Sequence, residues 1–234
     1  MPMENVKLLG KNISVEVWRP TGALPRSGVV VAYGTEGMLS PFDTTIRDFC
    51  AGLAAKGWLV ARPDFFTATA TSPGVGSVSM ALYLHGGSWV SCLSECLVWT
   101  RTQVNGGKVA LAGFSLGGNL VLNAALAGGA AAVVDYFGPV EKFGVEPLPT
   151  ATRLTAARCA KMPPALIHHG KIDKVVPLSE SDRLASWLVA NQVPHKFWKD
   201  YNCGHPGEQK GKSWPLPAEQ LALTRTIQFL GTHL

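Results

Sequence analysis

The sequence has few charged residues, and they form no runs. Asp, Glu, Lys and Arg make up 16% of the 234 residues and hydrophobic residues 47%, a balance that favours a buried core over disorder. The net charge is +5, but Lys and Arg are scattered, so we expect no nucleic-acid partner. The N-terminal segment lacks the basic-then-apolar pattern of a secretory signal, and no apolar stretch reaches membrane-spanning length. We therefore expect a soluble cytoplasmic protein with no membrane partner, either a monomer or a small homo-oligomer.

Cysteines are also few, and their spacing is that of neither a disulfide framework nor a metal site. Because the number is odd and no paired metal-site spacing occurs, we expect reduced thiols and no bound metal. Cys92 and Cys96 are one helical turn apart, which is more typical of helix packing than of metal binding. The five cysteines are Cys50, Cys92, Cys96, Cys159 and Cys203.

The chain does contain a regular alternation of apolar strands and amphipathic helices. Its length suits one domain, residues 1–234. The order predicts an α/β fold with a doubly wound, mainly parallel sheet and helices on both faces. Residues 65–87, crowded with Thr, Ser, Gly and Pro, predict an irregular connection near the ligand pocket. Strands are expected at 13–18, 29–33, 58–62, 108–112, 131–137, 165–169 and 195–198, and helices from Ser40-Pro41 to Lys56 and at 88–103, 116–127, 151–159, 179–191 and 217–230.

The segment from Val109 to Asn119, VALAGFSLGGN, is the centre of this pattern. A short apolar strand ends at Gly113, and a helix starts at Leu116. Ser115 is therefore expected at the tip of a sharp, strained turn, with its hydroxyl exposed at the carboxyl edge of the sheet. This arrangement is a nucleophile elbow. The ends of five strands should carry Glu36, Asp64, Ser115, Phe137 and Asp173 to the same edge.

A serine hydroxyl needs a base to activate it and an acid to orient that base. Asp173 follows the strand at 165–169, and His205 lies in a turn between the last strand and the terminal helix. The order Ser, Asp, His is that of an α/β-hydrolase. Asp135 is the alternative acid because it also lies on a strand. The alternative bases are His85, His168, His169, His195 and His233.

An oxyanion intermediate needs two preorganised hydrogen-bond donors. We expect one to be the backbone N–H of Leu116 and the other to come from Glu36 or Gly37, in the loop after the first central strand. His85-Gly86-Gly87 offers an alternative, since it is similar to the HGG oxyanion motif of lipases. It follows the strand at 58–62, one strand too late, so we interpret it as a turn before a helix.

Together these motifs resemble the dienelactone hydrolase family of α/β-hydrolases. The resemblance spans roughly Ser27 to the C-terminus, and it implies a fold without a large cap and hydrolysis of an ester or lactone through an acyl-enzyme. It rests on Gly113-Phe114-Ser115-Leu116-Gly117-Gly118, His169-Gly170-x-x-Asp173 with Val176-Pro177, Gly204-His205, Glu36 and Arg62-Pro63-Asp64.

The sequence departs from this family in two respects. Members that act on dienelactone usually have a cysteine nucleophile, where this chain has Ser115. The family also uses arginines to hold the substrate carboxylate, but no arginine follows Asp64 until Arg101, and the turn after His205 offers Lys210 rather than an arginine. Dienelactone itself is therefore not favoured as a substrate.

Glu36 needs a different role beside a serine nucleophile, because in the cysteine enzymes the matching glutamate is tied to thiol activation. An ionised carboxylate beside an oxyanion opposes its formation. We therefore expect Glu36 to contribute position, or to be held away by a hydrogen bond.

The sequence thus predicts a serine hydrolase that cleaves a small carboxylic ester or lactone without a cofactor. Ser115 is the expected nucleophile, His205 the base and Asp173 the orienting acid. One alternative keeps these residues but cleaves an amide or short peptide. Another is a non-catalytic scaffold of the same fold. For Cys203, close to His205, packing is favoured over catalysis.

Overall fold

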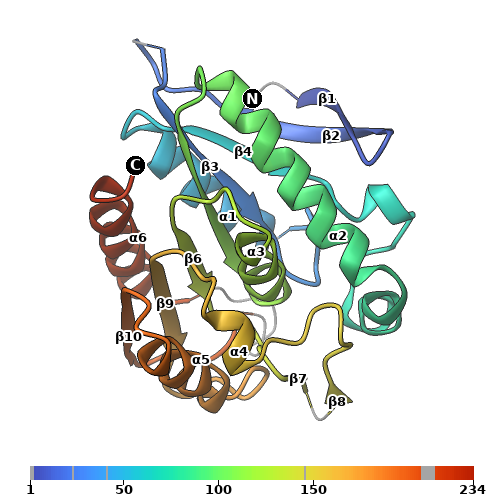
Figure 1. The fold of residues 1–234 in the computed structure, drawn as a ribbon, viewed down its shortest axis with the longest axis vertical. Helices are drawn as coiled ribbons and strands as arrows, with labels where there is room; N and C mark the ends of the chain where they lie inside the picture. Colours follow the sequence, from blue (N-terminus) through green and yellow to red (C-terminus); the bar gives the residue numbers. More distant parts are fainter. Residues whose placement is uncertain (1–2, 23, 41, 145, 207–213) are drawn as a thin grey trace.

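The computed structural model describes residues 3–22, 24–40, 42–144, 146–206 and 214–234. Eight strands form one sheet in the order β1-β2-β4-β3-β5-β6-β9-β10 (Figure 1). The two pairs β1–β2 and β2–β4 are antiparallel, and all other neighbours are parallel. The strands are β1 (Met3–Leu8), β2 (Lys11–Trp18), β3 (Ser27–Ala32), β4 (Leu59–Pro63), β5 (Lys108–Phe114), β6 (Val133–Tyr136), β9 (Ala165–Gly170) and β10 (His195–Tyr201).

Helices cover both faces of this sheet. α1 and α6 contact each other on one face, whereas α2 and α3 contact each other on the other. Every residue of β3, β4, β6 and β9 is buried, as strands between two helical layers require. The predicted doubly wound, mainly parallel sheet is confirmed. The helices are α1 (Phe42–Ala54), α2 (Val75–Gln103), α3 (Leu116–Leu126), α4 (Ala156–Cys159), α5 (Leu178–Ala190) and α6 (Leu216–Gly231).

The prediction for the segment before Ser88 was wrong. α2 begins at Val75, so most of the segment expected to be irregular is helical. Its buried face runs through Val78, Leu82, Gly86 and Trp89, a helical spacing that the many Ser and Gly residues obscured. Large apolar residues on the exposed side blurred the periodicity further, namely Met80, Tyr83, Leu84 and Val98.

Two short features were missed. β1 pairs with β2 through a turn at Leu9-Gly10, where both residues have positive φ, 52° and 71°, as a two-residue hairpin turn requires. A second hairpin, β7 (Lys142–Phe143) with β8 (Glu146–Pro147), occupies part of the expected loop after β6. Pro41, expected in the first turn of α1, lies outside the described residues, as does Lys210.

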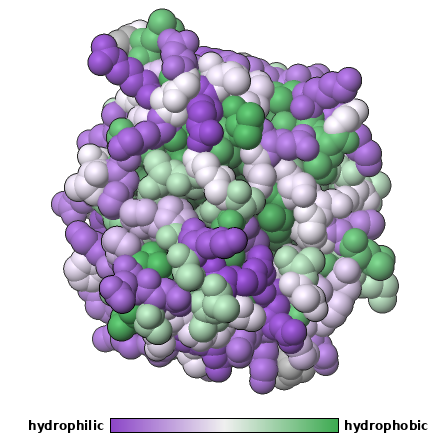
Figure 2. Space-filling view, viewed as in Figure 1, coloured by the Kyte–Doolittle hydropathy of each residue, from purple (hydrophilic) through white to green (hydrophobic). Residues whose placement is uncertain are grey.

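The surface and the thiols add two observations. No helix in the described part of the chain is long and apolar enough to span a bilayer. Apolar side chains are scattered among polar ones over the face that carries α2 (Figure 2). All five cysteines are buried free thiols, and Cys92 and Cys96 lie on the buried face of α2, as the packing interpretation predicted.

Candidate active site

The turn between β5 and α3 has the geometry of a nucleophile elbow. Ser115 adopts φ 53° and ψ −119°, a conformation that is strained for a residue with a side chain. Glycine flanks it because there is no room for a Cβ. At Gly113 a Cβ would lie 2.2 Å from the Gly117 carbonyl oxygen, and at Gly117 it would lie 2.4 Å from the carbonyl oxygen of Ala32.

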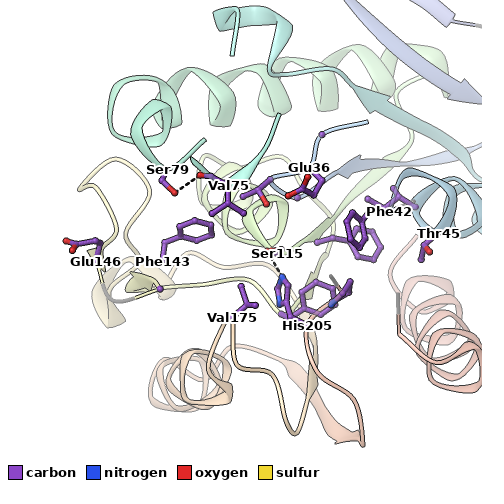
Figure 3. Close-up of a pocket in the computed structure, with 18 residues that line it drawn as sticks. Glu36, Phe42, Thr45, Val75, Ser79, Ser115, Phe143, Glu146, Val175 and His205 are labelled. Carbon is purple, nitrogen blue, oxygen red and sulfur yellow. Dashed lines mark hydrogen bonds between the residues drawn. The ribbon is translucent and has the colours of Figure 1, made fainter. Parts of the chain in front are cut away.

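Ser115, His205 and Asp173 form a continuous hydrogen-bonded relay. Ser115 Oγ lies 3.0 Å from His205 Nε2 (Figure 3). His205 Nδ1 lies 2.8 Å from Asp173 Oδ2. The Asp173 carboxylate accepts two further hydrogen bonds at Oδ1, from the N–H groups of Val175 at 2.9 Å and Val176 at 2.8 Å. These bonds orient the acid, which in turn selects the tautomer in which His205 Nε2 is free to accept a proton.

The alternative acid lies elsewhere. Asp135 is fully buried behind α3 and accepts a hydrogen bond from Gly138 N–H at 2.9 Å. Burial raises the pKa of Asp135 to about 7, and the Gly138 bond partly opposes this rise. Within the described part of the chain, the acid that is hydrogen-bonded to His205 is Asp173 and not Asp135.

Four of the five competing histidines have structural partners. His168 is bonded to Tyr201 and Thr226. His169 is bonded to Ser181 and to the Val176 carbonyl, and burial lowers the pKa of both imidazoles. His195 Nδ1 lies against the Val193 carbonyl, His233 packs on Phe229, and His85 lies inside α2.

The backbone N–H groups expected to bind the oxyanion differ in whether they are already hydrogen-bonded. Leu116 is the first residue of α3, where an N–H has no acceptor within its own helix. Gly37 N–H donates to the Gly34 carbonyl at 3.2 Å, whereas Glu36 N–H has no acceptor among the described residues. Leu116 and Glu36 therefore offer the two available amides. His85-Gly86-Gly87 is part of the α2 interior, not a turn before a helix as expected, and it does not line the pocket.

A cavity of about 660 Å³ opens over Ser115. Its walls are mainly apolar, and Figure 3 shows Phe42, Val75, Phe143 and Val175 around the space in front of Ser115 and His205. Of the five strand-end residues, Glu36, Ser115 and Phe137 line this cavity. Asp173 lies behind His205. Asp64 is elsewhere, bonded to the Tyr33 and Thr67 hydroxyls.

Glu36 is half-buried at the cavity wall. Its carboxylate has no hydrogen bond or ion pair within the described part of the chain. The expectation that a hydrogen bond holds it away from the site is therefore not met.

Arg62 stabilises the helix that forms one wall of the site. This fully buried arginine on β4 is bonded to Glu16 on β2, with Nε 2.8 Å from Oε2, and its Nη2 lies 2.6 Å from Asp43 Oδ1 on α1. α1 supplies Phe42, Thr45 and Ile46 to the cavity. Arg62 is thus committed to a buried ion-pair network, and no Lys or Arg is among the described residues that line the cavity.

The sequence did not reveal that two aromatic residues, Phe137 and Trp214, support the His205 turn. Phe137 has a positive φ of 46°, and its ring packs edge-on against His205 with centroids 4.9 Å apart. Trp214 Nε1–H donates to the Gly204 carbonyl at 2.9 Å. No local pattern marked either role, because both contacts join segments distant in sequence. Burial raises the pKa of the nearby Cys203 thiol to about 12, which fits the packing role expected for it.

Comparison with solved structures shows the fold at low sequence identity. The chain is similar to a puromycin-hydrolyzing peptidase of Mycobacterium tuberculosis, at 19% identity and TM-score 0.76, with 100% of this chain and 39% of that one covered. It is also similar to a dienelactone hydrolase-like promiscuous phosphotriesterase from metagenomic libraries, at 19% identity and TM-score 0.75, with 94% and 92% covered. A thermostable esterase from Pseudomonas putida shares 18% identity at TM-score 0.74, with 100% and 82% covered.

Comparison with functionally curated protein sequences gives no match. The sequence profile of the dienelactone hydrolase family, however, matches residues 13–234. That span contains the elbow, the His205 turn, the Asp173 loop and seven of the eight strands of the main sheet, although β2 begins two residues earlier. The chain belongs to the dienelactone hydrolase family.

Proposed function

We propose that this protein is a serine hydrolase that cleaves a small carboxylic ester or lactone through an acyl-enzyme. The observation that carries the proposal is the relay from Ser115 through His205 to Asp173, with distances of 3.0 and 2.8 Å. The family and its esterase relatives support hydrolysis of an ester. The cytoplasm, an expectation from the sequence, is the proposed location.

The first half of the reaction forms the acyl-enzyme. Ser115 Oγ attacks the ester carbonyl carbon while His205 Nε2 accepts the hydroxyl proton. Asp173 stabilises the imidazolium that forms. The N–H groups of Leu116 and Glu36 donate to the carbonyl oxygen as it becomes negative. When the intermediate collapses, the bond to the leaving oxygen breaks, and His205 returns the proton to the departing alcohol.

The second half uses water in place of serine. His205 Nε2 removes a proton from the water as it attacks the acyl carbonyl, and the same two N–H groups bind the new oxyanion. The bond to Ser115 Oγ then breaks, and the proton passes from His205 to that oxygen. An acid leaves and the enzyme is restored. In this mechanism each proton transfer uses His205 and requires no cofactor.

The cavity narrows the range of substrates. A volume of about 660 Å³ suits a small or medium-sized ligand. The walls are mainly apolar, and the described lining offers no Lys or Arg to pair with a substrate carboxylate. We therefore propose a substrate other than dienelactone.

The test is hydrolysis of p-nitrophenyl butyrate by the wild type and by Ser115→Ala. We expect kcat/KM to fall at least about a thousandfold in Ser115→Ala, because a nucleophile that acts with its base and acid is lost as a unit. Ser91→Ala is the matched control. Its hydroxyl is bonded to the Gly87 carbonyl of its own helix, away from the cavity, and its activity should stay within about twofold of the wild type. Equal activity in wild type and Ser115→Ala would refute the proposal.

Amide cleavage on the same residues is the second candidate, favoured by the similarity to a puromycin-hydrolyzing peptidase. Amides differ from esters mainly in needing protonation of a poorer leaving group by His205. Matched p-nitrophenyl ester and p-nitroanilide substrates with one acyl group separate the two. A higher kcat/KM on the anilide would replace the ester proposal with the amide one.

A further inference from the structure

The charged side chains that line the cavity beside Ser115 are acidic. Apart from His205, the charged residues in its described lining are Glu36 and Glu146. This is unexpected for a chain with 21 Lys and Arg against 16 Asp and Glu. Arg62, the buried arginine of the neighbouring strand, is occupied by Glu16 and Asp43. The described part of the cavity lining therefore carries acidic side chains, although the protein as a whole is basic.

Glu36 differs from the other acidic residues that are shielded from solvent. Glu180 accepts hydrogen bonds from three backbone N–H groups and pairs with Arg183, and Glu16 pairs with Arg62. Glu36, half-buried, has no such partner within the described residues. A carboxylate partly removed from water without a partner is unfavourable, and a cation that enters the cavity would supply the missing partner.

Aromatic rings form a second feature suited to a cation. The faces of aromatic rings attract ammonium groups, most strongly where water is excluded. Figure 3 shows Phe42 and Phe143 on opposite sides of the space that Glu36 faces. The phenylalanine residues that line the cavity are Phe42, Phe114, Phe137 and Phe143.

The position of Glu36 also links recognition to the reaction. Its backbone N–H is one of the two proposed oxyanion donors, so its carboxylate belongs to the same residue that must stabilise negative charge. An unpaired anion there opposes formation of the oxyanion. A positive group on the substrate would cancel this charge and lower the barrier, in addition to strengthening binding.

We infer that the substrate of this site carries a positively charged ammonium group near the scissile ester, held by the Glu36 carboxylate and the phenylalanine rings. The inference rests on the proposed ester hydrolase function and specifies its substrate class. Glu146 lies at the exposed end of the cavity and adds a weaker, solvent-screened attraction.

The test uses pairs of esters of one shape that differ only in charge. On the alcohol side the pair is butyrylcholine and neohexyl butyrate, in which carbon replaces the quaternary nitrogen. On the acyl side it is the p-nitrophenyl ester of γ-trimethylammoniobutyrate and its neutral carbon analogue. Carboxyethyl butyrate supplies the anionic member. At low ionic strength we expect kcat/KM for the cationic ester to exceed that of its neutral partner by about tenfold or more in at least one pair.

Glu36→Gln tests whether the Glu36 carboxylate causes the preference for cationic esters. It should bring the cationic-to-neutral ratio close to one, whereas Glu146→Gln should lower it by no more than about threefold. Glu4→Gln is the control because it removes one negative charge on β1, the outermost strand, and it should leave the ratio unchanged. On the neutral ester, any loss of kcat/KM in Glu36→Gln should be smaller than the loss in His205→Ala, because the carboxylate itself opposes the oxyanion. Comparable losses in these two variants would contradict the role given to the Glu36 side chain.

The outcomes separate this inference from the proposed function. Ser115-dependent hydrolysis with equal rates on cationic and neutral esters would overturn the inference alone. A preference for the anionic ester, or a cation preference that persists in Glu36→Gln, would also overturn it. If the wild type hydrolyses no member of the panel faster than Ser115→Ala, the proposed function fails and the inference fails with it.

Discussion

His169 Nε2 lies 3.6 Å from Asp173 Oδ2, the same oxygen that His205 Nδ1 approaches to 2.8 Å. The Nε2–H group of His169 donates to the Val176 carbonyl at 2.9 Å, and Val176 N–H donates to Asp173 Oδ1. Burial lowers the pKa of His169, which favours the neutral form of this imidazole. His169 therefore holds the loop that orients the acid of the proposed relay, and we assign it a positioning role.

We predict that His169→Leu lowers kcat about tenfold with little change in KM, because a displaced Asp173 misorients His205 without altering the cavity. It should also lower the free energy of unfolding by about 2 to 4 kcal/mol, since two buried hydrogen-bonding groups lose their partner. Steady-state kinetics and urea unfolding measure both effects.

Ser181→Ala is the matched control for His169→Leu. It removes the 2.6 Å contact with Nδ1 but leaves the Nε2 contacts intact, so it should cost stability while kcat stays within about threefold. A kcat loss in Ser181→Ala equal to that in His169→Leu would argue against positioning through Nε2.

Gly117→Ala should disrupt the elbow. The added Cβ would lie 2.4 Å from the carbonyl oxygens of both Ala32 and Tyr33, and backbone atoms of a central strand cannot move aside cheaply. We expect a loss of at least about 3 kcal/mol in unfolding free energy. Gly87→Ala, in α2 with the nearest atom at 3.8 Å, should be neutral or gain up to about 1 kcal/mol. Similar thermal midpoints for the two variants would refute this account of the elbow.

The buried Asp135 carboxyl should make the free energy of unfolding depend on pH. Burial raises its pKa to about 7, above the value of about 4 in an unfolded chain. Between these values the folded state binds more protons than the unfolded state. Asp135 therefore lowers the free energy of unfolding as pH rises from about 4 to 7, by up to about 1.4 kcal/mol per pH unit. Above that range it adds no further change. Asp135→Asn lacks this titration.

Urea unfolding of both proteins at pH 5, 6, 7 and 8 (roughly the span over which the group titrates) isolates the contribution of Asp135, because all other groups are common to both. The wild type should lose stability relative to Asp135→Asn between pH 5 and 7, and the difference should then level off. A difference independent of pH would mean that the Asp135 carboxyl is charged throughout.

The sequence predicted the parts of the molecule that local patterns specify. The apolar β-branched run of β3 identified a central strand, and the glycines around Ser115 identified the turn before α3. Asp173 and His205 were located by the loops that follow particular strands. The predicted strand and turn are found because the relevant constraint, burial or a strained turn, acts on neighbouring residues. The catalytic roles of Asp173 and His205 stay predictions.

The features that the sequence did not reveal depend on contacts between distant segments. Gly86 suggests a break in the helix, yet α2 continues through it. The glycine is needed there because Thr152 packs against this position, 2.8 Å from where a Cβ would lie. Phe137 and Trp214 support His205 only once β6 and the C-terminal segment are brought together. The commitment of Arg62 to Glu16 and Asp43 likewise follows from the pairing of β2 with β4 and the packing of α1.

The most direct test of the central claim is the intact-protein mass after treatment with a fluorophosphonate, followed by peptide mapping. We predict one adduct on the wild type, located on Ser115, because only a serine with a hydrogen-bonded base is activated toward this reagent. Ser79→Ala, which lacks the second serine hydroxyl of the described cavity lining, should still be labelled, and Ser115→Ala should not. An unlabelled wild type, or an adduct that persists in Ser115→Ala, would contradict the account of this protein as a serine hydrolase.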